Sequence, residues 1–156
     1  MIQLNIPGKD PVRVECLVLD YNGTMAVDGL PRDGCLERLA RLGEIVEVHV
    51  VTADTFGTVT GQLSGSGFTV EILPPGRQDE AKAAYVRKLG LRTTVAVGNG
   101  ANDARMLREA ALGIAVVQQE GAAFAAIQNA DAVFSHINDA LDALLQPDRL
   151  VATLRI

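Results

Sequence analysis

The chain has 156 residues, of which 48% are hydrophobic and 21% are charged, a composition typical of one soluble globular domain with a sizeable core. A second domain would not fit in this length. The 14 basic and 19 acidic side chains give a net charge of -5, and the basic residues are scattered, so we expect no nucleic-acid partner.

Short β-branched runs alternate with longer helical patterns from Val14 onward, which is typical of βαβ units. We therefore expect an α/β fold, three-layered and Rossmann-like, with a mainly parallel central sheet in one domain over residues 1–156. Residues 1–13 are expected to form a short strand or hairpin, because Gln3 to Ile6 alternates in polarity and Pro7-Gly8 turns the chain. The predicted strands are Val14–Leu19, Ile45–Val51, Thr69–Leu73, Thr93–Val97, Gly113–Val116 and Ala132–Phe134, and the predicted helices are Asp33–Leu42, Phe56–Leu63, Asp79–Leu89, Asn102–Ala110, Gly121–Gln128 and Asn138–Leu145.

Two polar side chains stand at predicted strand ends, where open parallel sheets bind their ligands. Asp20 precedes Asn22-Gly23-Thr24, whose turn-forming residues can aim backbone N–H groups at an anion. Thr52 ends a second strand, and its hydroxyl can donate to a phosphate oxygen. Each also has a plainer interpretation, Asp20 as a turn cap and Thr52 as a side chain bonded to its own loop. The residues alone leave both interpretations open.

Lys82 lies on the apolar face of a predicted helix, with Tyr85, Val86 and Leu89 at spacings of three, four and seven residues. Either its stem snorkels over the core toward water, or its ammonium neutralises an anion at the rim of a site. The position by itself favours snorkelling.

The loop 98–103, Gly-Asn-Gly-Ala-Asn-Asp, follows another predicted strand. Its two glycines allow tight backbone geometry, and its three polar residues offer oxygen ligands suited to a hard cation such as Mg2+. A helix N-cap explains Asn102 equally well. It explains Asp103 less well, because Asp103 shares an inward face with Met106 and a buried carboxylate needs a partner, for which Lys82 or a metal would serve.

No predicted segment suggests a membrane or a secreted protein. The longest apolar runs, such as 110–117, fall far short of the roughly 20 residues of a bilayer span, and the N-terminus does not resemble a signal peptide. We therefore expect no membrane partner and a cytoplasmic location. We interpret Cys16 as a core residue and Cys35 as incidental, and we expect neither these cysteines nor His49 and His136 to belong to a metal-ligand cluster.

The four strand-end and helix features lie in the order found in the haloacid dehalogenase (HAD) superfamily of phosphotransferases and phosphatases, which the chain resembles from Val14 to Val117. Asp20-Tyr21-Asn22-Gly23-Thr24 resembles the first motif of that superfamily, Thr52 the second, Lys82 the third and loop 98–103 the fourth. Each motif is short, but the ordered set is specific. The pairing of Asp-x-x-Gly-Thr with Gly-x-Gly-x-Asn-Asp looks most like the phosphorylation domain of P-type ATPases. The short gap between Asp20 and Thr52 implies a soluble member without a large cap domain.

The resemblance implies a phosphohydrolase or phosphotransferase that uses Mg2+ as its cofactor and forms an aspartyl phosphate on Asp20. The implied partner is a phosphorylated small molecule or a phosphoprotein, and an uncapped site implies a homo-oligomer. The implied catalytic residues are Asp20, Asn22, Thr52 and Lys82, the implied phosphate-binding residues are Thr52, Ala53, Lys82 and Asn102, and the implied metal ligands are Asp20, Asn22, Asn99 and Asp103.

Two residues depart from the family pattern. HAD phosphatases usually carry a second Asp, the general acid and base, two residues after the nucleophile, and here that position is Asn22, whose amide cannot exchange the proton. Asn99 stands where the motif has a metal-binding Asp, which should weaken Mg2+ affinity. The alternative is therefore a catalytically weakened HAD-like domain that binds a phosphorylated ligand or partner in a regulatory role. A receiver-like domain ranks below both, because its N-terminal acidic pair is not evident.

Overall fold

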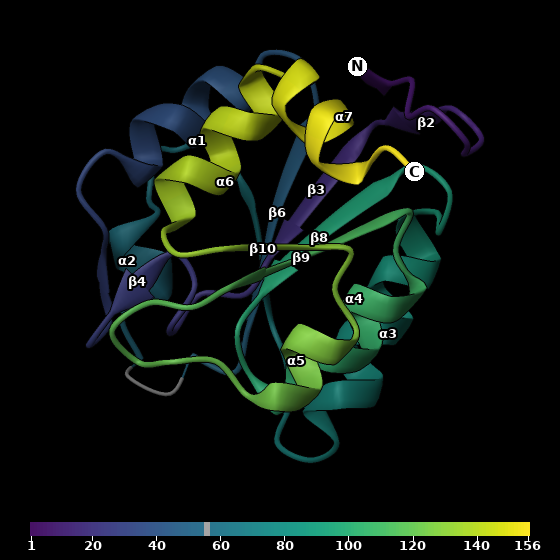
Figure 1. The fold of residues 1–156 in the computed structure, drawn as a ribbon. Helices are drawn as coiled ribbons and strands as arrows, with labels where there is room; N and C mark the ends of the chain where they lie inside the picture. Colours follow the sequence, from purple (N-terminus) through teal and green to yellow (C-terminus); the bar gives the residue numbers. More distant parts are fainter. Residues whose placement is uncertain (55–56) are drawn as a thin grey trace.

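The computed structural model describes residues 1–54 and 57–156, and its centre is a parallel six-stranded sheet with helices on both faces (Figure 1). The strand order is β10-β9-β8-β3-β6-β7, so β3 lies between β6 and β8. All neighbouring pairs in this sheet run parallel, which confirms the expected α/β class. The strands are β3 (Cys16–Leu19), β6 (Glu47–Thr52), β7 (Thr69–Ile72), β8 (Thr94–Gly98), β9 (Leu112–Val116) and β10 (Ala132–Phe134).

Helices cover the two faces of the sheet in separate groups (Figure 1). None of the helices in the described part of the chain is long and apolar enough to cross a membrane. The first face carries α1 (Cys35–Gly43), α6 (Ile137–Leu145) and α7 (Asp148–Leu154), and the second carries α3 (Gln78–Leu89), α4 (Ala104–Glu109) and α5 (Phe124–Gln128).

Successive residues of β3 pack into different cores because strand side chains alternate between the faces of a sheet. Leu17 and Leu19 belong to the core under α1 and α6, whereas Val18 belongs to the core under α3 and α4. Every residue of β3, β8 and β9 is buried. Near-continuous apolar strands of this kind are what a sheet covered on both faces requires.

Two small hairpins accompany the main sheet. β1 (Ile2–Leu4) pairs with β2 (Val12–Val14) in the region where a short strand or hairpin is expected. β4 (Ala26–Val27) pairs with β5 (Leu30–Pro31) just after Asp20. With α1, this second hairpin fills the space between Asp20 and Thr52, so no large cap domain is inserted there.

Several predicted boundaries differ from the structure. The expected helix 102–110 begins as a 3-10 turn, Ala101–Asp103, before α4, and the expected helix 121–128 starts only at Phe124. The helix predicted from Phe56 is reduced to α2 (Val59–Gln62), and Phe56 itself lies outside the described residues. The second hairpin and α7 are absent from the prediction. Two-residue strands show no alternation, whereas the prediction overlooks the apolar spacing within α7.

We expect Gly113→Ala to reduce the free energy of unfolding by about 1–3 kcal/mol, because overpacking a tight core has this cost. A Cβ at Gly113 would lie 2.3 Å from the backbone oxygen of Leu107. Urea unfolding followed by far-ultraviolet circular dichroism measures the change in a chain without tryptophan. Gly61→Ala is the control, because a Cβ there meets nothing within 4 Å. Equal stability of the two variants would contradict the expected clash.

Candidate functional site

Three adjacent strands end at the same edge of the sheet and present polar residues there. Leu19 of β3 pairs with Val50 of β6 on one side and with Val97 of β8 on the other. Asp20 follows directly, and its backbone N–H donates to the carbonyl of Val97 at 3.0 Å. The loops after β3 and β8 therefore meet around Asp20, as expected for the ligand-binding edge of a parallel sheet.

The ammonium of Lys82 lies between two carboxylates. Its Nζ is 2.5 Å from Oδ1 of Asp20 and 2.7 Å from Oδ1 of Asp103. Lys82 is only 1% exposed, so the interpretation that its stem snorkels toward water is wrong. The helix α3 packs against α4 and the turn that holds Asp103, and this packing directs the lysine inward.

Asp103 is held by the backbone as well as by Lys82. Its Oδ2 accepts the N–H groups of Asn99 at 3.0 Å and of Gly100 at 2.8 Å. The side chain is fully buried, and these contacts provide the partners that a buried carboxylate needs. Gly98 makes the arrangement possible, because a Cβ at that position would lie 2.5 Å from Cγ of Asp103.

A second chain of contacts joins Asp20 to Asn99 through Thr24. The Thr24 hydroxyl is 3.4 Å from Oδ2 of Asp20 and 3.2 Å from Oδ1 of Asn99. Nδ2 of Asn99 donates to the carbonyl of Gly121 at 3.1 Å, which turns Oδ1 toward Thr24. One hydroxyl proton therefore faces two acceptor oxygens, and only one of them can receive it.

The cluster carries more negative than positive charge, because Asp20 and Asp103 share the single ammonium of Lys82. Burial, followed by the neighbouring Asp103 carboxylate, raises the pKa of Asp20 to about 7. Burial alone would lower the pKa of Lys82, but the attraction of both carboxylates outweighs it and raises that pKa. A further cation would correct the imbalance.

The donor set of this edge fits a hard divalent cation. Carboxylate and amide oxygens of Asp20, Asp103 and Asn99 are the oxygen ligands that Mg2+ takes. Oδ1 of Asn22 is also buried and has no hydrogen-bond partner among the residues that the structure describes. The residues implied as metal ligands therefore fit such a group chemically.

The remaining predicted site residues lie at the same edge in less connected positions. Thr52 is buried at the end of β6, where its Oγ1 accepts the N–H of Asp54 at 3.0 Å. Thr52 is thus bonded to its own loop, as the plainer interpretation of this residue expects. Because the oxygen accepts in this bond, the hydroxyl proton can still donate to a ligand. Ala53 follows it and is exposed, and Asn102 is half-buried in the 3-10 turn. Within the described residues, none of these three forms a hydrogen bond with Asp20.

Gln118 is a site residue that the sequence interpretation missed. Its Nε2 donates to the carbonyls of Gly23 at 3.2 Å and Thr24 at 2.8 Å, and its Oε1 accepts the N–H of Ile137 at 2.9 Å. It thereby ties the loop after Asp20 to the loop after β9. The rule that points to Asp20, a polar residue just beyond an apolar strand, also applies to Gln118.

Sequence comparison finds two relatives and no matching family model. The uncharacterized protein MJ0073 of Methanocaldococcus jannaschii is 51% identical over 61 residues, which cover 39% of this chain and 66% of that protein. The uncharacterized protein MJ0072 of the same organism is 46% identical over 39 residues, which cover 25% of this chain and 89% of that protein.

Solved structures of phosphatases resemble most of the chain. A 3-deoxy-D-manno-octulosonate 8-phosphate phosphatase of Moraxella catarrhalis, bound to magnesium, phosphate and KDO, has a TM-score of 0.64 at 16% identity and covers 91% of this chain and 94% of its own. The cobalt-bound phosphatase of Haemophilus influenzae has a TM-score of 0.66 at 16% identity, and the match covers 86% of this chain and 88% of its own. A phospho-aspartyl intermediate analogue of phosphoserine phosphatase has a TM-score of 0.68 at 18% identity, and the match covers 85% of this chain and 99% of its own. At such identities the likeness shows the fold.

We expect Lys82→Met to reduce the free energy of unfolding by about 3 kcal/mol in metal-free buffer, because it leaves two buried carboxylates without their counterion. Lys88→Met, an exposed change on the same helix, should cost less than about 1 kcal/mol. Urea unfolding of both variants measures the difference. Equal effects would show that the buried ammonium is not needed to hold the carboxylates.

Proposed function

We propose that this chain, which belongs to the same family as MJ0072 of Methanocaldococcus jannaschii and has the fold of HAD superfamily phosphatases, is a Mg2+-dependent phosphohydrolase acting through Asp20. The observation that carries the proposal is the Lys82 ammonium held between Asp20 and Asp103 at the ligand-binding edge. Phosphate, magnesium and a phospho-aspartyl analogue in the neighbouring structures support the same chemistry. A special likeness to P-type ATPases stays a prediction.

Asp20 is the proposed nucleophile. One of its carboxylate oxygens forms a bond to phosphorus while the bond to the leaving group breaks and the leaving group departs with the electron pair. The Lys82 ammonium, which already contacts Asp20, balances the charge of the transferred phosphoryl group. Bound Mg2+ would supply a further cation that neutralises the charge of the transferred group. Water then attacks the aspartyl phosphate and releases phosphate and the Asp20 carboxylate.

The other predicted residues receive supporting roles in this proposal. Thr52, with its free hydroxyl proton, and the neighbouring Ala53 backbone N–H would donate to phosphoryl oxygens, together with Asn102. Asn22, through its backbone carbonyl, would join Asp20, Asn99 and Asp103 around the metal. The ligand would be a phosphorylated small molecule or a phosphoprotein.

Asn99 is matched to this particular loop. Its Nδ2 donates to the Gly121 carbonyl, and the Asn99 carbonyl in turn accepts the N–H of Ala123 at 2.8 Å. An Asp at position 99 would place an oxygen against the Gly121 carbonyl and add a third carboxylate beside Asp20 and Asp103. The amide therefore preserves the loop, and we propose that it does so at reduced Mg2+ affinity.

We also propose that copies of the chain associate, as expected for an uncapped member of this superfamily. The hairpin of β4 and β5 after Asp20 carries Leu30, whose side chain is large, apolar and 61% exposed. Burial of this side chain between two copies would remove apolar surface from water and so stabilise the associated form.

We expect Asp20→Asn to abolish Mg2+-dependent hydrolysis of p-nitrophenyl phosphate and acetyl phosphate, because the amide cannot form the aspartyl phosphate. The same variant should unfold at a temperature equal to or higher than the wild type in metal-free buffer, because it removes excess negative charge beside Asp103. Asp10→Asn, an exposed change, is the control. Activity that survives Asp20→Asn in folded protein would overturn the proposal.

We expect Asn22→Asp to increase turnover about 100-fold, within the range that a general acid and base contributes. Intact-mass measurement after incubation with acetyl phosphate and Mg2+ should show a longer-lived phosphoryl adduct on the wild type than on this variant. Glu44→Gln, which changes an exposed side chain, is the control and should behave like the wild type in both measurements. A stable adduct on the wild type with negligible turnover would favour a regulatory role. No adduct on either protein would contradict the covalent route.

A further inference from the structure

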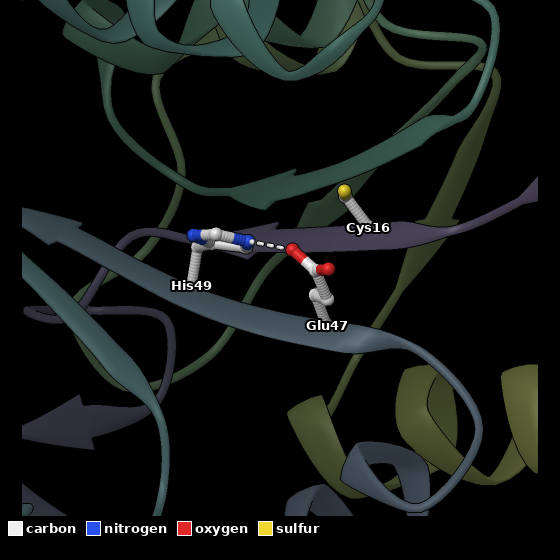
Figure 2. Close-up of side chains that lie close together, drawn as sticks. All are labelled: Cys16, Glu47 and His49. Atoms are coloured by element: carbon white, nitrogen blue, oxygen red, sulfur yellow. Dashed lines mark ion pairs between the residues drawn. The ribbon is translucent and has the colours of Figure 1, made fainter.

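Three potential metal ligands meet at the edge of the sheet opposite to Asp20. Cys16, Glu47 and His49 each offer a ligand atom, and these atoms all lie within 4.8 Å of one another (Figure 2). Cys16 pairs with Glu47 across β3 and β6, and Glu47 and His49 lie two residues apart on the same face of β6. The structure thus brings Cys16 and His49 together with a carboxylate, a proximity that spacing along the chain does not reveal because neighbours across strands are set by register.

His49 is oriented as a metal-binding histidine would be. Its Nδ1 is 3.0 Å from the hydroxyl of Tyr85, and its Nε2 points toward Glu47, with 3.4 Å between Nε2 and Oε2 (Figure 2). The residue is 6% exposed, and Nε2 has no hydrogen-bond partner among the described residues. When Nδ1–H donates to Tyr85, the lone pair of Nε2 faces a carboxylate oxygen. In this tautomer two acceptors face one another, and a metal ion between them would satisfy both, as a proton on Nε2 does in the other tautomer.

Cys16 contributes a thiol in negative surroundings. Its side chain is buried, and burial together with the Glu47 and Glu15 carboxylates raises the pKa of the thiol. These carboxylates attract a cation, and a bound metal replaces the thiol proton. The Glu47 side chain is 77% exposed, so it can turn toward an ion and leave one side of it open to solvent.

We propose that Cys16, Glu47 and His49 form a Zn2+ site with a fourth position open to water. The mixed sulfur, nitrogen and oxygen donors suit Zn2+, whereas Mg2+ and Ca2+ take oxygen ligands. The observed distance of 3.4 Å between Nε2 and Oε2 is close to the separation of about 3.3 Å between two ligand atoms of a tetrahedral zinc ion. Tyr85 holds the other ring nitrogen, as partners of zinc-bound histidines do.

This site is separate from the phosphoryl site. Cys16 begins β3 and Asp20 follows its last residue, so roughly 13 Å of strand lies between them at about 3.3 Å per residue. Zinc at this position would clamp the amino ends of β3 and β6, the strands that carry Asp20 and Thr52. The zinc proposal does not depend on the phosphohydrolase proposal, and each can be tested without the other.

The test is Zn2+ titration of the full chain against a chromophoric chelator, with Mg2+ in excess so that the opposite edge does not compete. We expect one Zn2+ per chain. Substitution by Co2+ should add a thiolate-to-cobalt charge-transfer band in the near ultraviolet. Cys16→Ser should lose this band and weaken Zn2+ binding by at least about 100-fold, whereas Tyr85→Phe should weaken it by about 10-fold.

Cys35→Ser is the matched control, because Cys35 is the other buried thiol and lies in α1 away from the cluster. It should keep both the band and the affinity. Glu47→Gln decides the matter if Cys16→Ser does not fold, because Glu47 is exposed and its change leaves the core intact. It should weaken binding by at least about 10-fold. Absence of stoichiometric binding by the wild type, or wild-type affinity in Glu47→Gln, would overturn the proposal.

Discussion

The buried contact of Lys82 with Asp20 and Asp103 is the interaction on which the rest of the site depends. Removing these charges from water is costly, so each must find its partners within the fold. The strand order provides them by placing β3 beside β8, and α3 delivers the ammonium from the face of the sheet. When both carboxylates are ionised, one negative charge remains without a counterion. In the proposed function, a bound cation would meet that charge and allow an anionic ligand to approach.

Backbone groups fix the geometry around this contact more than side chains do. Asp103 accepts two loop N–H groups, Asn99 is held by the Gly121 carbonyl, and Gln118 bonds the carbonyls of Gly23 and Thr24. Loops from three strands are thereby joined to one another. Polar groups that are held in place before a ligand binds need not reorganise when charge develops, which is where electrostatic stabilisation is most effective.

The sequence predicts the parallel sheet and the importance of Asp20, because apolar strands that end in polar loops are visible in one dimension. The sequence misjudges Lys82 when the residue is taken alone. Helical spacing shows that the lysine faces inward, but it does not show that the carboxylates of Asp20 and Asp103 lie next to its ammonium. The meeting of Cys16 with His49 depends on strand register, which no spacing rule encodes. The hairpin after Asp20 is too short to show a period, whereas the spacing of Leu150, Val151 and Leu154 could have revealed α7.

The depth of Asp20 has a consequence for access to its carboxylate. Its side chain is only 11% exposed, although no cap domain interrupts the chain between Asp20 and Thr52. The fold itself therefore withdraws this carboxylate from solvent, a task for which no inserted domain is needed here. In the proposed function, a phosphorylated ligand would have to bring its phosphoryl group to the sheet edge and displace the water that still reaches Asp20.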